Sequence, residues 1–225
     1  MLSLLAITQF SYLTYAQTDH WTVKSGENIN TVLPTNVKFH YDKFTEGSVF
    51  FRDGKRSNAS LNYNLLTEEM QFIAPTGDTL AVANEATLKY IVIKNDTFFY
   101  DKTYVQLISG NATAKLAKKE ILGIINVKKA GAYDQFSSTS SITTVKSLNL
   151  QDRVTNLTEN QEITLLKQKL YYIGDTYNHF LPVNKKNIIK LFGKKQSAIE
   201  QYLKDNKVEF NKEEDLKALV LFLES

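Results

Sequence analysis

The sequence contains no cysteine, and only 3 prolines and 9 glycines occur among its 225 residues. Without cysteine the chain has no disulfide, no thiolate nucleophile and no sulfur ligand for a metal, so its stability has to come from packing. The scarcity of proline and glycine, together with 13 phenylalanines and 12 tyrosines, argues against disorder. This composition favours a well-packed, aromatic-rich β protein.

An excess of one charge is also missing. Lysine and arginine number 27, aspartate and glutamate number 24, and the two signs are interspersed along the chain. Such a chain produces no long-range field that would attract a polyanion, so we expect no nucleic-acid partner. No segment after the first 16 residues has the ~20 apolar residues that a membrane-spanning helix needs, and we expect no transmembrane span in the mature chain.

Signatures of catalysis are scarce as well. The three histidines, His20, His40 and His179, lie far apart and form no His-Glu-x-x-His pattern. His40 and His179 each have an aspartate nearby, Asp42 and Asp175, and we interpret both pairs as surface hydrogen bonding.

Other chemical motifs are missing too. The serines of residues 137–141 lack the Gly-x-Ser-x-Gly turn of a serine nucleophile, and no glycine-rich phosphate loop or calcium loop is present. The sequence therefore predicts no metal site, no cofactor and no enzymatic activity. A hydrolase whose site gathers distant residues stays open as an alternative.

The first 16 residues indicate where the protein goes. They are apolar from Leu2 to Ile7, and a small residue, Ala16, precedes Gln17. This pattern is typical of a secretory signal peptide cleaved after Ala16, although no lysine or arginine precedes the apolar stretch. We expect a secreted, periplasmic or cell-envelope protein. The alternative is that the segment forms an unusual first strand.

Alternating apolar and polar residues dominate the next part of the chain. Residues 47–51 and 59–65 read as strands around a turn at Asp53-Gly54, and residues 69–73 continue the alternation with Met70 and Phe72 inward. Further strands are expected at residues 79–83, 88–93, 97–100, 104–108 and 163–173. Residues 112–127 continue the sheet, or form a short helix or a bent pair of strands. Residues 131–144 lose periodicity and read as a long loop.

After Pro182 the apolar period becomes helical. Residues 188–192 form an apolar stripe that stops at Gly193, and a second helix ends near Asn206. A third helix is expected to begin with Asn211 as N-cap and Glu214 completing a capping box.

The resulting fold class is α+β. We expect an antiparallel β-meander sheet, with strong curvature as an open alternative, in a β-rich domain of residues 17–182. A C-terminal segment of three helices, residues 183–225, should pack on the rest of the chain.

The turn and core residues resemble a group of exported, uncharacterised proteins from bacteria of the Bacteroidota type. The resemblance rests on several short motifs spread over most of the chain: Phe44-x-x-Gly47-x-Val49, Leu61-Asn-Tyr-Asn64, Gly77-Asp78-Thr-Leu80, Gly131-Ala-Tyr133 and Ile199-x-x-Tyr202-Leu203. It implies export and a β-rich fold with a helical ending, and it assigns no catalytic residue.

Three functions are compatible with these observations. The leading hypothesis is a non-catalytic envelope or secreted protein with a binding or scaffolding role, in which Tyr133, Asp134 and Phe136 of the long loop contact a partner such as an envelope protein. Otherwise the two rings fold back over the sheet edge. The second hypothesis is a carrier for an apolar ligand held between the sheet and the C-terminal helices. The third is the hydrolase mentioned above.

Overall fold

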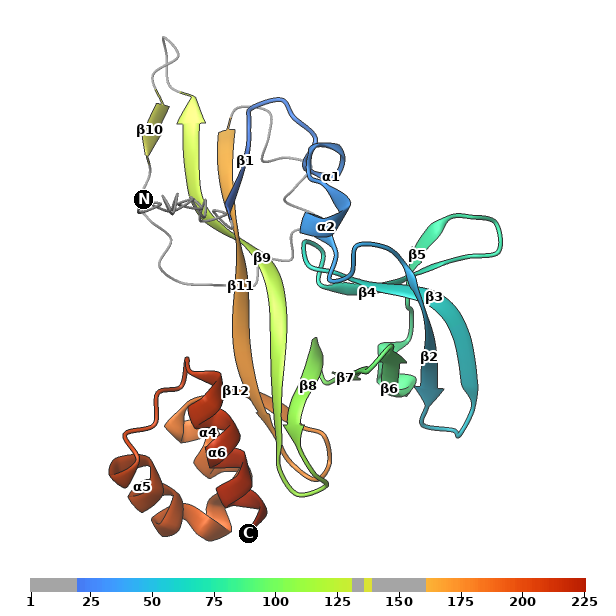
Figure 1. Ribbon diagram of the computed structural model, residues 1–225. Helices are drawn as coiled ribbons and strands as arrows, with labels where there is room; N and C mark the ends of the chain where they lie inside the picture. Colours follow the sequence, from blue (N-terminus) through green and yellow to red (C-terminus); the bar gives the residue numbers. More distant parts are fainter. Residues whose placement is uncertain (1–19, 131–135, 139–160) are drawn as a thin grey trace, which may run out of the picture.

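The computed structural model describes residues 20–130, 136–138 and 161–225, and within them antiparallel β-structure dominates. Long strands run through the middle of the molecule, with shorter strands on one side and helices at one end (Figure 1). The described strands, which form one 12-stranded sheet, are β1 (His20–Val23), β2 (Thr45–Phe51), β3 (Arg56–Asn64), β4 (Glu69–Ile73), β5 (Thr79–Ala81), β6 (Leu88–Ile93), β7 (Asp96–Tyr100), β8 (Tyr104–Gly110), β9 (Lys115–Ala130), β10 (Phe136–Ser138), β11 (Gln161–Gly174) and β12 (Phe180–Pro182).

The order of the strands differs from the expected meander, most clearly at β6. Strands β2 to β5 pair consecutively, but β6 returns to the free edge of β2 instead of pairing with β5. The path through the sheet is β1-β11-β9-β8-β7-β6-β2-β3-β4-β5, so a simple meander is wrong. Burial accounts for this choice, because all three residues of β5 are exposed whereas the longer β2 buries Val49.

The sheet is strongly curved but not closed. Tyr63 on β3 and Tyr104 on β8 have ring centroids 6.0 Å apart, although four strand-to-strand steps separate β3 from β8. Farther along, the backbone N–H of Leu122 on β9 donates to the carbonyl of Leu65, which follows β3, at 2.8 Å. The curl therefore brings side chains from distant strands together on the concave face.

Two long strands carry this curvature. β9 and β11 pair from Lys115↔Gly174 to Lys129↔Gln161, with a bulge between Thr164 and Leu165. Of the expected segment 112–127, residues from Lys115 onward belong to a strand, which excludes the helical alternative for them, whereas residues 112–114 precede it. Part of the expected long loop is also a strand, because β10 pairs with the end of β9.

A short N-terminal segment covers the core beside the sheet. It contains α1 (Ile29–Val32) and α2 (Thr35–Lys38), which no pattern in the sequence predicted. The segment buries the side chains of Ile29, Leu33 and Val37. They pack in the same hydrophobic cluster as Leu61, Met70 and Ile91. This cluster holds the N-terminal segment against the curved part of the sheet.

The C-terminal helices pack against the other end of the long strands. They are α4 (Lys185–Phe192), the single-turn η2 (Gly193–Lys195), α5 (Gln196–Asp205) and α6 (Glu213–Glu224). Leu216, Leu219 and Leu223 of α6 form a buried cluster with Leu116 and Ile173 of the sheet.

One expected boundary of these helices is confirmed, and another is wrong. α4 ends at Phe192 with Gly193 as its C-cap, as expected, but η2 joins it to α5, so Lys185 to Asp205 is one continuous helical stretch. The N-cap of α6 is Lys212 instead of Asn211, and its side chain makes no capping hydrogen bond. Asp215 in the first turn instead accepts a hydrogen bond from the backbone N–H of Glu209 at 3.0 Å. Within the described residues, none of the helices has the length and apolar character required to cross a membrane.

Candidate functional site

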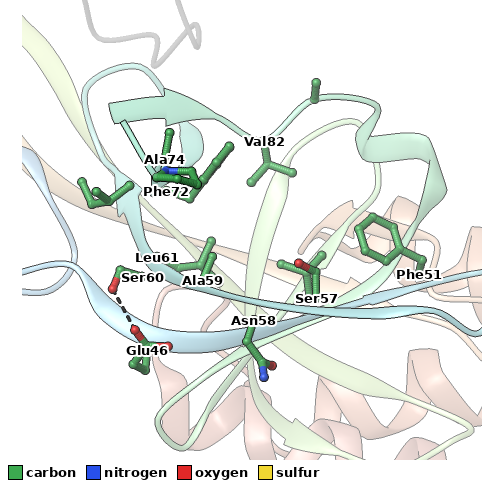
Figure 2. A pocket seen from close by; sticks show the side chains of 14 residues that line it. Glu46, Phe51, Ser57, Asn58, Ala59, Ser60, Leu61, Phe72, Ala74 and Val82 are labelled. Atoms are coloured by element: carbon green, nitrogen blue, oxygen red, sulfur yellow. Dashed lines mark hydrogen bonds between the residues drawn. The ribbon is translucent and has the colours of Figure 1, made fainter. Parts of the chain in front are cut away.

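An apolar groove lies where β3 passes from its pairing with β2 to its pairing with β4 (Figure 2). Its volume is about 580 Å³. The apolar residues that line it include Val49, Phe51, Ala59, Leu61, Phe72 and Val82. Pockets for small molecules are generally 300–1,000 Å³ in volume and mostly apolar, so both the size and the lining suit an apolar ligand.

The alternation of β3 builds the floor of this groove. Ser57, Ala59 and Leu61 point to one side of the strand, and Figure 2 shows them facing the space below Val82. Asn58 lies between them in the sequence and points to the opposite side. The sequence encodes this face plainly as alternate residues, but the same alternation also describes a strand covered by an ordinary core.

The neighbouring strand β2 contributes the wall and one end of the groove. Gly47 lets β2 approach β6 closely, because a Cβ at this position would lie 2.7 Å from the carbonyl oxygen of Val92. A register shift between Phe50 and Phe51 then ends the regular pairing with β6. Phe50 contacts Tyr90, with ring centroids 4.6 Å apart, while Phe51 lines the groove.

The electrostatic character of the groove is nearly neutral. Glu46 is the one ionisable residue among those that line it, and its carboxylate accepts a hydrogen bond from Ser60 Oγ at 3.0 Å. Along β3, Ser60 alternates with Ala59 and Leu61. The hydrogen-bonded pair Glu46–Ser60 therefore lies on the face of the β2–β3 hairpin opposite to the floor of the groove. The floor therefore offers a ligand apolar contact without a charged anchor.

A second cavity, of about 520 Å³, lies between the sheet and the C-terminal helical segment. It is lined by Lys169, Tyr171 and Tyr172 of β11 and by Phe210 and Asn211, which precede α6. This is the place that the carrier hypothesis proposed for an apolar ligand. Its lining is more polar than that of the groove, because lysine, tyrosine and asparagine side chains contribute to it.

A buried charged cluster joins the N-terminal segment to β9. His40 Nδ1 lies 2.7 Å from Glu120 Oε2, and His40 Nε2 lies 4.0 Å from Asp96 Oδ2. The side chains of His40 and Glu120 are only 14% and 11% exposed. The expectation of surface hydrogen bonding at His40 is therefore wrong, because the curl of the sheet buries it against a carboxylate 80 positions away.

The environment of this cluster shifts several pKa values. Burial alone would raise the pKa of Glu120, but the hydrogen bond with His40 and the ion pair with Lys118 at 3.0 Å outweigh it and lower the pKa to about 2. Burial and the hydrogen bond from its hydroxyl to Asp96, at 2.6 Å, raise the pKa of Tyr41. Glu120 is therefore held as a carboxylate and Tyr41 as a neutral phenol.

The space beside the His40–Glu120 pair is very small. The adjoining cavity has a volume of about 10 Å³ and is lined by Tyr63, Tyr104 and Gln106 as well as by the pair itself. A volume of that size accepts a single water molecule. A histidine hydrogen-bonded to a buried carboxylate is the arrangement of a general base, but this one has no adjoining space for an organic substrate.

The residues singled out from the sequence have different outcomes. Tyr133 and Asp134 lie outside the described residues, and of Phe136 only the backbone is described, in β10 opposite Ala130. Their proposed role in binding a partner stays a prediction. The expected surface pairing of His179 with Asp175 is confirmed, at 3.2 Å, in the turn between β11 and β12.

The residues of the groove were interpreted from the sequence only as core. Phe72 was expected inward together with Met70, yet Met70 is fully buried whereas Phe72 is partly exposed at the groove. Alternation at residues 57–61 and 70–72 was the one signal that pointed to this face. It could not show that the face is left partly uncovered.

Metal binding and similarity to known proteins give no further assignment. In the part of the chain that the structure describes, no three histidine, aspartate or glutamate side chains are grouped so that they could hold a metal ion. No family model matches the chain, and no curated protein or solved structure is similar to it at a significant level.

Proposed function

We propose that this protein is an exported, non-catalytic binding protein that holds an apolar ligand in the groove of β2, β3 and β4. The observation that carries the proposal is the 580 Å³ groove with an apolar floor formed by alternate residues of β3. Export rests on the apolar N-terminal stretch and Ala16 before Gln17. A role in binding agrees with the one-water size of the space beside the His40–Glu120 pair.

The ligand class follows from the electrostatics of the groove. No lysine or arginine lines it, and its one carboxylate, that of Glu46, is bonded to Ser60. An anionic group entering the groove would lose its hydration and gain no opposite charge. The site therefore favours a neutral apolar molecule over a carboxylate or sulfonate of similar shape.

A matched pair of fluorescent probes tests this proposal. N-phenyl-1-naphthylamine is neutral, and 1-anilinonaphthalene-8-sulfonate has the same aromatic body with a negative charge. We expect the neutral probe to bind to the folded protein at one site and at least ~10-fold more tightly than the sulfonate, because a difference of ~1.4 kcal/mol corresponds to a factor of ten.

Two substitutions in the β2–β3 hairpin provide the control. Ala59→Trp fills the floor of the groove and should weaken binding of the neutral probe at least ~10-fold. Ser48→Trp adds the same side chain on β2, at a residue that does not line the groove, and should leave binding unchanged. Unfolding midpoints of both variants verify that they fold. Equal binding by the wild type and Ala59→Trp would show that the groove is not the site.

A further inference from the structure

A small polar cavity inside the curl of the sheet contains buried groups that are not yet accounted for. The hydroxyls of Tyr63 and Tyr104 and Oε1 of Gln106 have no hydrogen-bond partner among the described residues, and all three residues line this cavity. Tyr63 is 2% exposed and Tyr104 is 3% exposed. A buried polar atom without a partner costs ~1–3 kcal/mol, so three in one place require a common explanation.

The orientation of Gln106 is set by a neighbour. Its Nε2 donates to Asp96 Oδ1 at 2.7 Å, which leaves Oε1 as a free acceptor. The two tyrosine rings lie 6.0 Å apart between centroids, and each hydroxyl both donates and accepts. A small molecule between them therefore needs at least one donor and one acceptor.

The charges around the cavity indicate a neutral occupant. Three cationic or potentially cationic side chains line it, and each has a carboxylate partner: His40 and Lys118 contact Glu120, and Lys119 contacts Glu68. No unpaired positive charge thus remains to hold an anion such as chloride. The tyrosine hydroxyls, which supply both a donor and an acceptor, suit a neutral hydrogen-bonding molecule.

The size of the cavity limits that molecule further. A water molecule needs about 10–15 Å³ and two to four polar partners, and the cavity supplies about 10 Å³ and three partners. We propose that it is a specific binding site for one internal water molecule. The water accepts a hydrogen bond from one tyrosine hydroxyl and donates to the other hydroxyl and to Gln106 Oε1.

This water would have a structural role in the curvature of the sheet. Tyr63 belongs to β3, whereas Tyr104 and Gln106 belong to β8, which is not adjacent to β3 in the sheet. The water therefore bridges two strands across the concave face, next to the His40–Glu120 pair. Unlike the apolar groove, this site is enclosed and serves the fold instead of an external ligand.

Magnetic relaxation dispersion of water ²H and ¹⁷O counts long-lived internal waters and tests the proposal in solution. The double substitution Tyr63→Phe with Tyr104→Phe removes two of the three partners and should lower that count by one. Tyr177→Phe removes a hydroxyl from a side chain that is 76% exposed and should leave the count unchanged. An equal count in the wild type and the double variant would overturn the proposal.

A high-resolution crystal structure of the unmodified protein keeps the proposal testable if the double variant does not fold. The expected result is one ordered water within hydrogen-bond distance of Tyr63 Oη, Tyr104 Oη and Gln106 Oε1. Direct hydrogen bonds among these three groups would contradict the proposal. So would chloride at this position, identified by its anomalous signal in crystals grown with the salt.

Discussion

At the scale of single residues, Glu120 has the most consequential environment in the molecule. Its carboxylate contacts His40 at 2.7 Å and Lys118 at 3.0 Å, and its side chain is 11% exposed. Ion pairs at this depth offset the cost of burial only while both partners remain charged. The connection between the N-terminal segment and β9 therefore depends on the ionisation of one carboxyl group.

Stability should consequently depend on pH through Glu120. Its pKa in the folded protein, about 2, lies below the ordinary value of 4.5, so its contribution is fully present above about pH 4.5 and is lost as the pH falls toward 2. Glu120→Gln should lower the unfolding free energy by about 3 kcal/mol at pH 7, and the difference from the wild type should shrink by pH 3.

Denaturant titrations of both proteins at several pH values measure this difference. The matched control is Glu200→Gln, because the ion pair of Glu200 with Lys185 is exposed at the surface and should contribute less than ~1 kcal/mol. A difference between wild type and Glu120→Gln that is the same at pH 7 and pH 3 would contradict the assigned role.

At the scale of elements, α6 is the helix whose packing is most clearly defined. Leu216, Leu219, Val220 and Leu223 are buried along one side, and Leu221 on the other side is 67% exposed. The buried side contacts β8 and β9, so this helix links the C-terminal segment to the middle of the sheet. Its stripe of leucines has the 3.6-residue period of a half-buried helix.

Two leucine substitutions in α6 measure this packing. Leu219→Ala should cost ~2–5 kcal/mol of unfolding free energy, because it leaves a cavity at a fully buried position. Leu221→Ala removes the same atoms from an exposed position two residues away and should change stability by less than ~0.5 kcal/mol. Chemical denaturation gives both values, and similar costs for the two variants would show that α6 is oriented differently.

At the scale of the whole molecule, β3 contributes to both the groove and the enclosed polar cavity. The groove forms where β3 changes partners, and the enclosed cavity forms where β3 faces β8. The groove faces solvent and is apolar, whereas the enclosed cavity is buried and polar. The same strand thus lies between the apolar groove and the polar interior across which the sheet curls.

Export is the prediction that concerns the whole chain. Because Ala16 provides the small residue that signal peptidase needs, protein recovered from the envelope fraction of its native host should begin at Gln17. Intact-mass measurement decides this directly. Recovery of a cytosolic chain that retains Met1 would show that the segment does not act as a secretory signal.

The sequence by itself determined the local structure of many elements and the buried side of α6. Alternation predicted β4 and β11, Asp53-Gly54 predicted the turn between β2 and β3, and helical spacing predicted the buried leucines of α6. These features depend on neighbours within a few positions, so local patterns record them. The absence of cysteine determined equally directly that packing replaces disulfides.

Only the tertiary structure decided what each buried side faces. The return of β6 to β2, the pairing of His40 with Glu120 and the partial exposure of Phe72 all depend on contacts between distant segments. An alternating pattern reads the same whether a face meets a helix, another strand or an open groove, because periodicity specifies burial but not the partner. The candidate site therefore emerged from how neighbouring strands cover one another, which no local pattern specifies.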